Sequence, residues 1–283
     1  MKSSGIRYGP ARGQVADLWM PAVPPQQEGA LAERPSLTDV LSSGLGIGHD
    51  GPPRPVVVLL HGGSWRVPYT KILMRKLARD VMARGWAAWN VEYGRVGFGG
   101  RGGWPNTFLD VAAAIDRLHR VPGVDSSRVV AVGHSAGGAL ALWAAARHRL
   151  AEGRPGASPL VGLRGVVGLA PAVDLVQAAG DGSPDNVVVR FLGGPPERHP
   201  DRYADASPIE RVPIEVPQIL IHGSDDRTIA PASSEIYVAR AAAAGDRAKY
   251  ELVDGVDHRS IIRPDGPAWE LAVSHIARLL GEV

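Results

Sequence analysis

The feature that most constrains the fold of this sequence is a regular alternation of short apolar runs with segments of helical periodicity. The apolar runs are PVVVLLHGG (55–63), WAAWNVEY (86–93), RVVAVG (128–133), LRGVVGLAPAV (163–173), PQILIHG (217–223) and YELVDG (250–255). Continuous runs of this length are typical of strands buried on both faces of a sheet. Apolar residues at helical spacing lie between most of these runs, over 70–84, 108–120, 136–149, 233–245 and 268–280. We therefore predict an α/β fold with a mainly parallel central sheet and helices on both faces.

Three segments depart from this rhythm. Residues 14–20 (QVADLWM) predict a further strand. Residues 21–54, rich in Pro, Gly and Ser, predict a variable N-terminal loop with a short helix over 36–41. Residues 174–213 separate two strands by more than a crossover needs, which predicts a small cap or lid insertion with a helix or two. We expect the whole chain, 1–283, to form a single domain.

The composition argues against several functional classes. The 283 residues are 45% apolar and 21% charged, which is ordinary for a globular protein with a sizeable core. Its basic residues form no Lys/Arg run, so no nucleic-acid partner is expected. The absence of cysteine excludes disulfides, thiolate metal sites and a cysteine nucleophile. We see no signal-peptide pattern and no apolar run long enough to cross a bilayer, so we expect a cytoplasmic protein with no membrane partner.

Residues 133–137 (GHSAG) lie between a predicted strand and a predicted helix. They match G-x-S-x-G, and strand–turn–helix is the context in which that pattern presents a nucleophilic serine. At so sharp a turn, the residues two before and two after Ser135 must be nearly free of side chain. The hydroxyl then lies above the sheet at a helix N-terminus, where free N–H groups favour negative charge. We predict that Ser135 is a nucleophile; the alternative is a glycine-rich turn with an incidental serine.

A serine hydroxyl needs a base, and the base needs an orienting acid. His258 directly follows the last predicted strand, so it should lie at the same sheet edge as Ser135. The stretch LIHGSDDRTIAP (220–231) ends another strand with Asp225 and Asp226, and only one of them can be the partner. The order serine, aspartate, histidine is that of α/β-hydrolase triads. Other histidines are weaker candidates for the base: His61, His134 and His222. Other aspartates are weaker candidates for the acid: Asp174, Asp254 and Asp257.

The turn HGGSW (61–65) follows the first buried strand and is the candidate oxyanion hole. Its glycines allow backbone N–H groups to turn into a site. The predicted donors are the N–H groups of Gly63 and Ser64, together with that of Ala136 after the serine. The alternative is an ordinary glycine-rich β-turn. Chemistry of this kind requires no metal and no cofactor.

The motifs HGGSW, GHSAGG, HGSDD and a late DH resemble those of the α/β-hydrolase fold over roughly residues 55–282. More narrowly, they resemble esterases of the hormone-sensitive-lipase type and kynurenine formamidase-like enzymes. In that family the acid is the fourth residue after the histidine of the HG turn, which implies Asp226. The chain departs from the family's HGGG or HGGY at Ser64, and the proline after the acid loop is displaced to give IAP. A backbone donor tolerates the serine, whereas the substrate class stays open.

The expectation is a serine hydrolase that cleaves small to medium carboxylic esters through an acyl-enzyme. The alternatives are an arylformamidase, a non-catalytic binding protein and a biosynthetic acyltransferase on the same fold. Trp65, Tyr93 and Trp104 are the predicted substrate contacts, and Arg95 or Arg101 is a candidate for binding a substrate carboxylate. The insertion at 174–213 is expected to limit substrate size. Monomer and homodimer both stay open.

Overall fold

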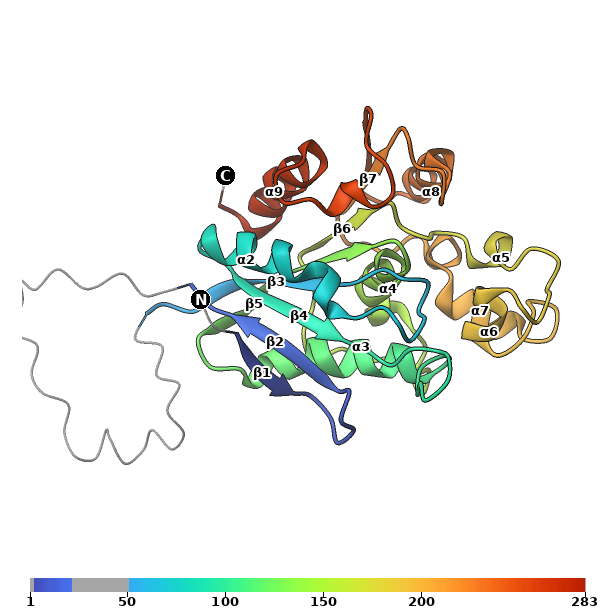
Figure 1. The fold of residues 1–283 in the computed structure, drawn as a ribbon, viewed down its shortest axis with the longest axis horizontal. Helices are drawn as coiled ribbons and strands as arrows, with labels where there is room; N and C mark the ends of the chain where they lie inside the picture. The colour runs from blue at the N-terminus through green and yellow to red at the C-terminus, as the bar shows by residue number, and fades with distance from the viewer. Residues whose placement is uncertain (1–2, 22–50, 283) are drawn as a thin grey trace, which may run out of the picture.

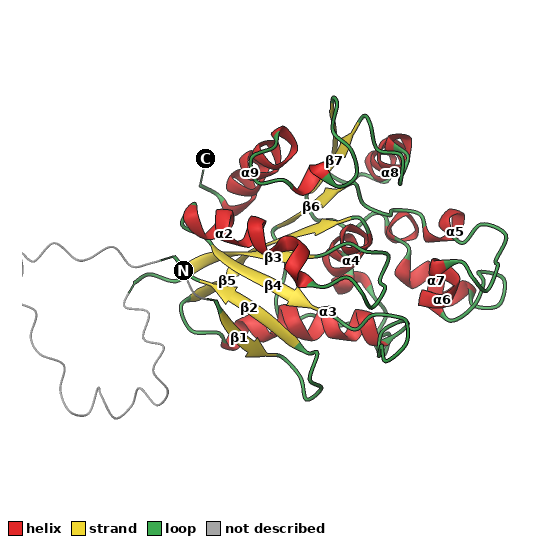
Figure 2. Cartoon of the chain, in the orientation of Figure 1, coloured by secondary structure: helices red, strands yellow, loops and turns green. Residues whose placement is uncertain are grey.

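The computed structural model describes residues 3–21 and 51–282. Its centre is an eight-stranded sheet in the order β1-β2-β4-β3-β5-β6-β7-β8 (Figures 1 and 2). The strands are β1 (Ser4–Arg7), β2 (Val15–Trp19), β3 (Arg54–Leu60), β4 (Ala87–Glu92), β5 (Val124–His134), β6 (Gly165–Leu169), β7 (Gln218–Gly223) and β8 (Ala248–Val253). Pairings β1–β2 and β2–β4 are antiparallel and the others are parallel. The predicted mainly parallel sheet is confirmed, and β1, whose SGIR sequence carries no strand pattern, is added at the edge.

Helices cover both faces of this sheet. They are α2 (Arg75–Ala83), α3 (Asn106–Asp116), α4 (Ala136–Ala145), α5 (Leu175–Ala178), α6 (Val187–Leu192), α7 (Pro200–Ala206), α8 (Pro231–Ala243) and α9 (Pro267–Leu280). Short 3₁₀ helices are η1 (Lys71–Met74), η2 (Arg117–Arg120), η3 (Arg147–Arg149), η4 (Pro208–Arg211) and η5 (Ser260–Ile262). Apolar side chains of α3, α4 and α8 join one core cluster and those of α2 and α9 join the other.

Strand β3 shows why the central runs are apolar throughout. Val56, Val58 and Leu60 point into the core on the α3–α4 face, while Val57 and Leu59 point into the core on the α2–α9 face. Successive side chains of a strand point to opposite faces, so a strand covered on both sides presents apolar side chains in both directions. This packing fixes the carboxyl ends of β3, β5 and β7 along one edge of the sheet.

Two predicted elements are shorter in the structure. The run at 163–173 forms a strand only over Gly165–Leu169, because Ala170 has a φ of 46° and Pro171 follows it. The helix predicted over 136–149 ends at Ala145 and continues as the 3₁₀ turn η3. In both cases the apolar pattern continues past the point where the backbone changes direction.

The segment 174–213 lies between β6 and β7 and contains α5, α6, α7 and η4. These helices gather at one end of the molecule, beyond α4 and far from β1 (Figure 1). Asp174 caps α5 by accepting the amide of Gln177, and Asn186 caps α6 in the same way. Of the predicted loop 21–54, residues 22–50, with the predicted helix over 36–41, lie outside the described residues. No helix in the described part of the chain has the length and hydropathy of a membrane span.

Candidate active site

Ser135 lies at a strained turn between β5 and α4. Its φ of 53° and ψ of −119° are outside the favoured regions for a residue with a side chain. A Cβ on Gly133 would come 2.1 Å from the carbonyl oxygen of Gly137, and a Cβ on Gly137 would come 2.2 Å from that of Leu60. Both neighbours must therefore be glycine. The turn itself is held in place where the amide of Ser135 donates to the carbonyl of Leu169 at the end of β6 (2.9 Å).

Ser135, His258 and Asp226 form a continuous chain of hydrogen bonds. The Ser135 hydroxyl donates to Nε2 of His258 across 2.9 Å. Nδ1 of the same ring donates to Oδ2 of Asp226 across 2.6 Å. The three side chains come from turns after β5, β8 and β7, far apart in the chain but adjacent at the sheet edge. The structure therefore brings the three predicted residues together in the geometry of a serine, its base and its orienting acid.

Asp226 is buried and held as a carboxylate by its own turn. Its Oδ1 accepts the backbone N–H groups of Thr228 (2.8 Å) and Ile229 (2.9 Å). Burial by itself would raise the pKa of Asp226, but the bonds from Ile229, His258 and Thr228 outweigh it and lower that pKa. A negative charge beside Nδ1 of His258 keeps that nitrogen protonated and leaves Nε2 free to accept a proton.

His222 is a further contact of the same carboxylate, and its contribution was not foreseen. Its Nε2 lies 3.2 Å from Oδ2 of Asp226 and donates to the carbonyl of Ile229 at 3.0 Å. Its Nδ1 accepts the hydroxyl of Ser234 at 2.8 Å. Burial lowers the pKa of His222, so the ring stays neutral. The spacing H-x₃-D at the end of strand β7 could have identified this contact. Two residues that are four positions apart at the end of a strand can face the same turn.

The other acidic candidates have separate partners. Asp225 is exposed and its Oδ1 accepts the hydroxyl of Ser224. Asp254 also accepts that hydroxyl, Asp257 caps the turn before η5, and Asp174 caps α5. Asp226 is the one of these carboxylates that contacts His258 within the described structure.

The turn after β3 lies directly against Ser135. A Cβ on Gly62 would come 3.1 Å from that of Ser135, so this glycine allows the two turns to touch. The next three residues have left-handed backbone, with φ values of 110° at Gly63, 52° at Ser64 and 55° at Trp65. Ala136 is the first residue of α4, where N–H groups have no partner within the helix. The three predicted oxyanion donors, Gly63, Ser64 and Ala136, therefore lie on segments that flank the serine.

Ser64→Gly is expected to stabilise the fold by about 1 kcal/mol, because glycine adopts a positive φ without the steric cost that serine bears. Its kcat/KM should stay within about twofold, since a backbone N–H is retained. Thermal unfolding and initial rates measure the two effects. Ser64→Ala is the matched control: it removes the hydroxyl, keeps the strain and should give no stability gain. A tenfold loss of activity in both variants would instead assign a role to the hydroxyl.

Three buried side chains, those of His61, Glu92 and Tyr93, pack against one another next to this turn. The ring of Tyr93 stacks on that of His61 at 4.2 Å, and its hydroxyl donates to the carbonyl of His61 at 2.5 Å. Nε2 of His61 lies 3.4 Å from Oε1 of Glu92. His61 and Tyr93 are almost fully buried. Tyr93, predicted as a substrate contact, is thus placed as a support of the backbone after β3.

His134 connects the serine turn to the loop that carries His258. Its Nε2–H donates to the backbone carbonyl of His258 at 2.8 Å, and the two rings lie 4.9 Å apart. Its Nδ1 is buried without a partner among the described residues. Burial, followed by the nearby His258 ring, lowers the pKa of His134 to about 4.

Acid should destabilise the protein through His134. Above pH 6.5 a histidine whose pKa is lowered by folding is neutral in both the folded and the unfolded protein. Between pH 6.5 and the lowered pKa, the unfolded chain takes up a proton that the folded protein does not, so the folded state loses stability. With a folded pKa of about 4, this group should remove roughly 2.5 kcal/mol of stability between pH 7 and pH 4.5. Urea unfolding at both pH values measures this loss of stability. The loss should be smaller in His134→Gln than in wild type. It should equal that of wild type in His119→Gln, which changes an exposed histidine. An equal loss in all three proteins would contradict this assignment.

A cavity of about 440 Å³ opens beside the serine. Its lining comprises Gly63, Ser64, Tyr69, Leu73, His134, Ser135, Thr228, His258, Arg259 and Ile262. The predicted contacts Trp65, Tyr93 and Trp104 are absent from this lining in the described structure. Trp65 stacks on Phe191 at 4.3 Å and Trp104 packs edge-on against Phe108 at 5.0 Å. Tyr69 and Leu73, from the segment after the turn at 61–65, supply apolar surface at the cavity instead.

The arginines considered for a substrate carboxylate already have protein partners. Arg95 pairs with Glu92 at 3.2 Å, and Arg101 pairs with Asp110 at 2.5 Å. Within residues 3–21 and 51–282, no group of three or more histidine, aspartate or glutamate side chains is arranged to hold a metal ion.

Comparison with known proteins connects this geometry to a family. The BD-FAE family matches residues 48–240, more than half of the chain. The esterase LipC of Mycobacterium tuberculosis is 30% identical over 212 residues, which is 66% of this chain and 48% of LipC. The chain thus spans about half the length of that relative.

Solved structures match over nearly the whole chain. A truncated carbohydrate esterase from gut microbiota superimposes with a TM-score of 0.78 at 18% identity, covering 99% of this chain and 97% of that one. The esterase Est2 of Thermogutta terrifontis with butyrate bound gives 0.71 at 19% identity, covering 99% and 95%. At such identities the likeness shows the fold, and it confirms the predicted α/β-hydrolase fold. The narrower resemblance to hormone-sensitive-lipase or kynurenine formamidase types stays a prediction.

Proposed function

Because this chain belongs to the BD-FAE family of proteins, we propose that it is a serine carboxylesterase that hydrolyses small to medium carboxylic esters. The observation that carries the proposal is the hydrogen-bonded chain from Ser135 through His258 to Asp226 beside an open cavity. The names of its relatives support it: LipC is an esterase, and Est2 has been solved with butyrate and with propionate bound.

In the first step Ser135 Oγ attacks the ester carbonyl carbon while its proton passes to Nε2 of His258. Asp226 supports this transfer in two ways: it holds Nδ1 as the donor tautomer, and it stabilises the imidazolium that forms. The short Nδ1–Oδ2 contact of 2.6 Å is consistent with a strong, charge-assisted bond of this kind.

The carbonyl oxygen becomes negatively charged in the tetrahedral intermediate. The backbone N–H groups of Gly63, Ser64 and Ala136 stabilise that oxygen, and the N-terminus of α4 adds a favourable dipole. Losing one such donor typically costs about 3 kcal/mol of transition-state stabilisation. These donors are backbone groups on strained or helix-terminal segments, so they need little reorganisation during the reaction.

Collapse of the intermediate breaks the carbon–oxygen bond to the alcohol. Nε2 of His258 returns its proton to the departing alkoxide, which leaves as the alcohol, and the acyl group stays on Ser135. Water then attacks the acyl-enzyme with His258 as base, and a second collapse releases the carboxylic acid and restores the serine hydroxyl.

The cavity supports a short or medium substrate. Its volume of about 440 Å³ lies within the usual range for small-molecule sites. Apolar surface from Tyr69, Leu73 and Ile262 suits a short acyl or aryl group. The insertion at 174–213 is proposed to restrict access by polymers and folded proteins.

The test combines covalent labelling with a substrate panel. A fluorophosphonate probe should modify wild type at Ser135, as located by peptide mass spectrometry, and should leave Ser135→Ala unmodified. In parallel, p-nitrophenyl acetate and butyrate are compared with N-formylkynurenine. Ester turnover well above formamide turnover supports the carboxylesterase; the reverse order would make the protein an arylformamidase. Absence of both labelling and turnover would point to a non-catalytic protein on this fold.

A further inference from the structure

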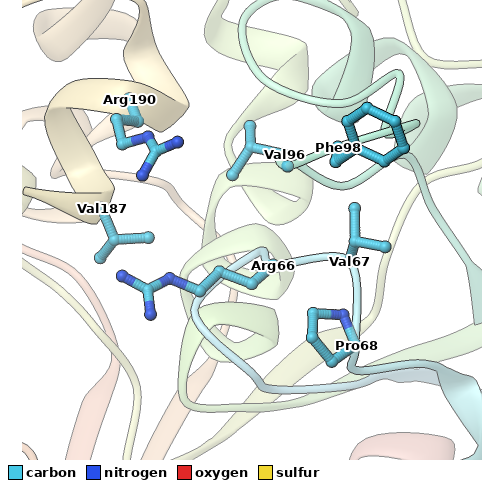
Figure 3. A pocket seen from close by; sticks show the side chains of 8 residues that line it. Arg66, Val67, Pro68, Val96, Phe98, Val187 and Arg190 are labelled. Atoms are coloured by element: carbon cyan, nitrogen blue, oxygen red, sulfur yellow. The ribbon is translucent and has the colours of Figure 1, made fainter. Parts of the chain in front are cut away.

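A second cavity, of about 430 Å³, lies beside α6 and is not used by the proposed chemistry (Figure 3). We call it the arginine basin. Its lining comprises Arg66, Val67, Pro68, Val96, Gly97, Phe98, Val187 and Arg190. In Figure 3 the side chains of Arg66, Val187 and Arg190 lie toward one side, and those of Val67, Pro68 and Phe98 toward the other.

One loop separates the basin from the active-site cavity. Gly63, Ser64 and Tyr69 line the cavity with Ser135, whereas the intervening Arg66 and its two successors line the basin. The amide of Arg66 donates to the carbonyl of Gly63 at 2.9 Å, so the chain folds tightly between them. The basin and the active-site cavity are therefore lined by successive parts of the same loop.

The basin carries positive charge that the described residues do not neutralise. Its lining contains two arginines and no acidic residue. Within residues 3–21 and 51–282, the guanidinium groups of Arg66 and Arg190 make no ion pair or hydrogen bond. Arg95 and Arg101 nearby differ, since each is paired with a buried carboxylate. Two arginines of this kind facing a concave surface favour an anionic ligand.

The rest of the lining is apolar. Phe98 exposes its whole side chain (103% of the reference area), and Val96 and Val187 in the same lining are half-buried. A fully exposed phenyl ring in a basin that also holds two arginines offers a surface for stacking or apolar contact. The lining thus suits a group that combines an apolar or aromatic body with an anion.

The walls of the basin are joined to one another before any ligand binds. Arg66 and Val96 form a parallel β-bridge, and the amide of Val67 donates to the carbonyl of Val96 at 3.1 Å. The stacking of Trp65 on Phe191 ties the loop to α6, next to Arg190. A preformed site loses little conformational entropy on binding, so modest contacts can give measurable affinity.

We propose that the arginine basin binds a carboxylate borne by an aromatic or apolar part of the ester substrate while the scissile carbonyl lies at Ser135. Arg66 and Arg190 bind the carboxylate through charge-assisted hydrogen bonds, and Phe98 contacts the apolar or aromatic part of the substrate to which the carboxylate is attached. This inference rests on the proposed esterase function and adds a preference for anionic esters. The carboxylate can belong to the alcohol or to the acyl part, and the experiment separates these cases.

The kinetic test uses matched pairs of esters. For the alcohol part, 4-acetoxybenzoate is compared with 4-acetoxybenzamide; for the acyl part, the p-nitrophenyl monoester of adipic acid is compared with p-nitrophenyl hexanoate. In at least one pair, wild type should favour the anionic ester after correction for spontaneous hydrolysis. Arg66→Gln and Arg190→Gln should each reduce the anionic-to-neutral ratio of kcat/KM by about tenfold, mainly through KM. Added salt should weaken the preference of wild type.

Two control variants locate the effect. Arg198→Gln removes the same charge from an exposed position of the insertion outside the basin lining, and should leave the ratio unchanged. Arg259→Gln removes the arginine of the active-site cavity itself. Loss of the preference in Arg259→Gln alone, or no preference in either ester pair, would overturn the proposal.

A binding measurement separates this inference from the proposed function. Calorimetric titration of Ser135→Ala with 4-hydroxybenzoate and with 4-hydroxybenzamide requires no turnover. The proposal for the alcohol part is supported if the benzoate binds more tightly than the benzamide and if Arg66→Gln or Arg190→Gln weakens benzoate binding about tenfold. This result would support the basin even if no ester were hydrolysed. Adipate monoamide against hexanamide, which differ only in the distal carboxylate, tests the acyl side in the same way. Equal binding of anion and amide in both pairs would overturn the basin while leaving hydrolysis of neutral esters intact.

Discussion

Ser135→Ala is expected to lower kcat for the best ester by about 10⁶-fold, and His258→Ala by a similar factor. The two residues act as one unit, because the base has no proton to accept without the serine and the serine is a poor nucleophile without the base. The double variant should therefore be no slower than either single variant. Steady-state rates with p-nitrophenyl butyrate, after subtraction of the spontaneous reaction, measure this.

Folding and contamination are the alternatives to exclude. The bond from the Ser135 amide to the carbonyl of Leu169 remains available in Ser135→Ala, so the unfolding temperature should stay close to that of wild type. Residual activity that a fluorophosphonate removes would come from a contaminating serine hydrolase, because Ser135→Ala itself has no nucleophilic serine for the probe to modify. Ser135→Ala with more than a tenth of wild-type activity would disprove its role as the nucleophile.

Asp226→Asn is expected to lower kcat by about 10⁴-fold. The amides of Thr228 and Ile229 both donate to Oδ1, so an asparagine must place its oxygen there and its NH₂ group at the Oδ2 position. That NH₂ group then donates to Nδ1 of His258, which shifts the ring hydrogen to Nε2. An imidazole in this tautomer cannot accept the proton of Ser135 at neutral pH.

Asp225→Asn is the matched control, because it makes the same chemical change one residue earlier on an exposed side chain. It should change kcat by less than about twofold, in line with a surface substitution. Rates of both variants across pH 5 to 9, with unfolding temperatures, complete the comparison. Equal losses in the two variants would mean that the charge of the whole turn, and not Asp226 itself, governs the rate.

The strands and the serine turn were predictable because their causes are local or periodic. A strand covered on both faces needs apolar side chains in both directions, as Val56 to Leu60 provide, and that requirement is visible in the residues themselves. Gly133 and Gly137 are required by contacts with atoms a few residues away or on the adjacent strand. Strand β1 was missed because its pairing with β2 depends on the backbone and leaves no pattern in SGIR.

Residues that act through contacts between distant segments were harder to predict. Asp225 and Asp226 are chemically identical neighbours, and the pattern of the residues alone left both open. Their difference comes from the turn after β7, which buries one carboxylate against His258 and exposes the other. Trp65, Tyr93 and Trp104 lie in loops or next to a strand end, and such a position does not reveal which way a side chain points.

The sequence by itself determined the alternating architecture, the strained serine turn and the residue types of the proposed chemistry, because steric and periodic requirements act over a few residues. Only the tertiary structure decided that His222 and His134 contact the proposed acid and base, that Tyr69 and Leu73 line the cavity in place of the tryptophans, and that Arg66 and Arg190 share a basin. Each of these pairings joins segments that lie far apart in the chain, or depends on side-chain direction. They arise only when parallel strands bring their carboxyl ends to one edge and the loops pack against each other there.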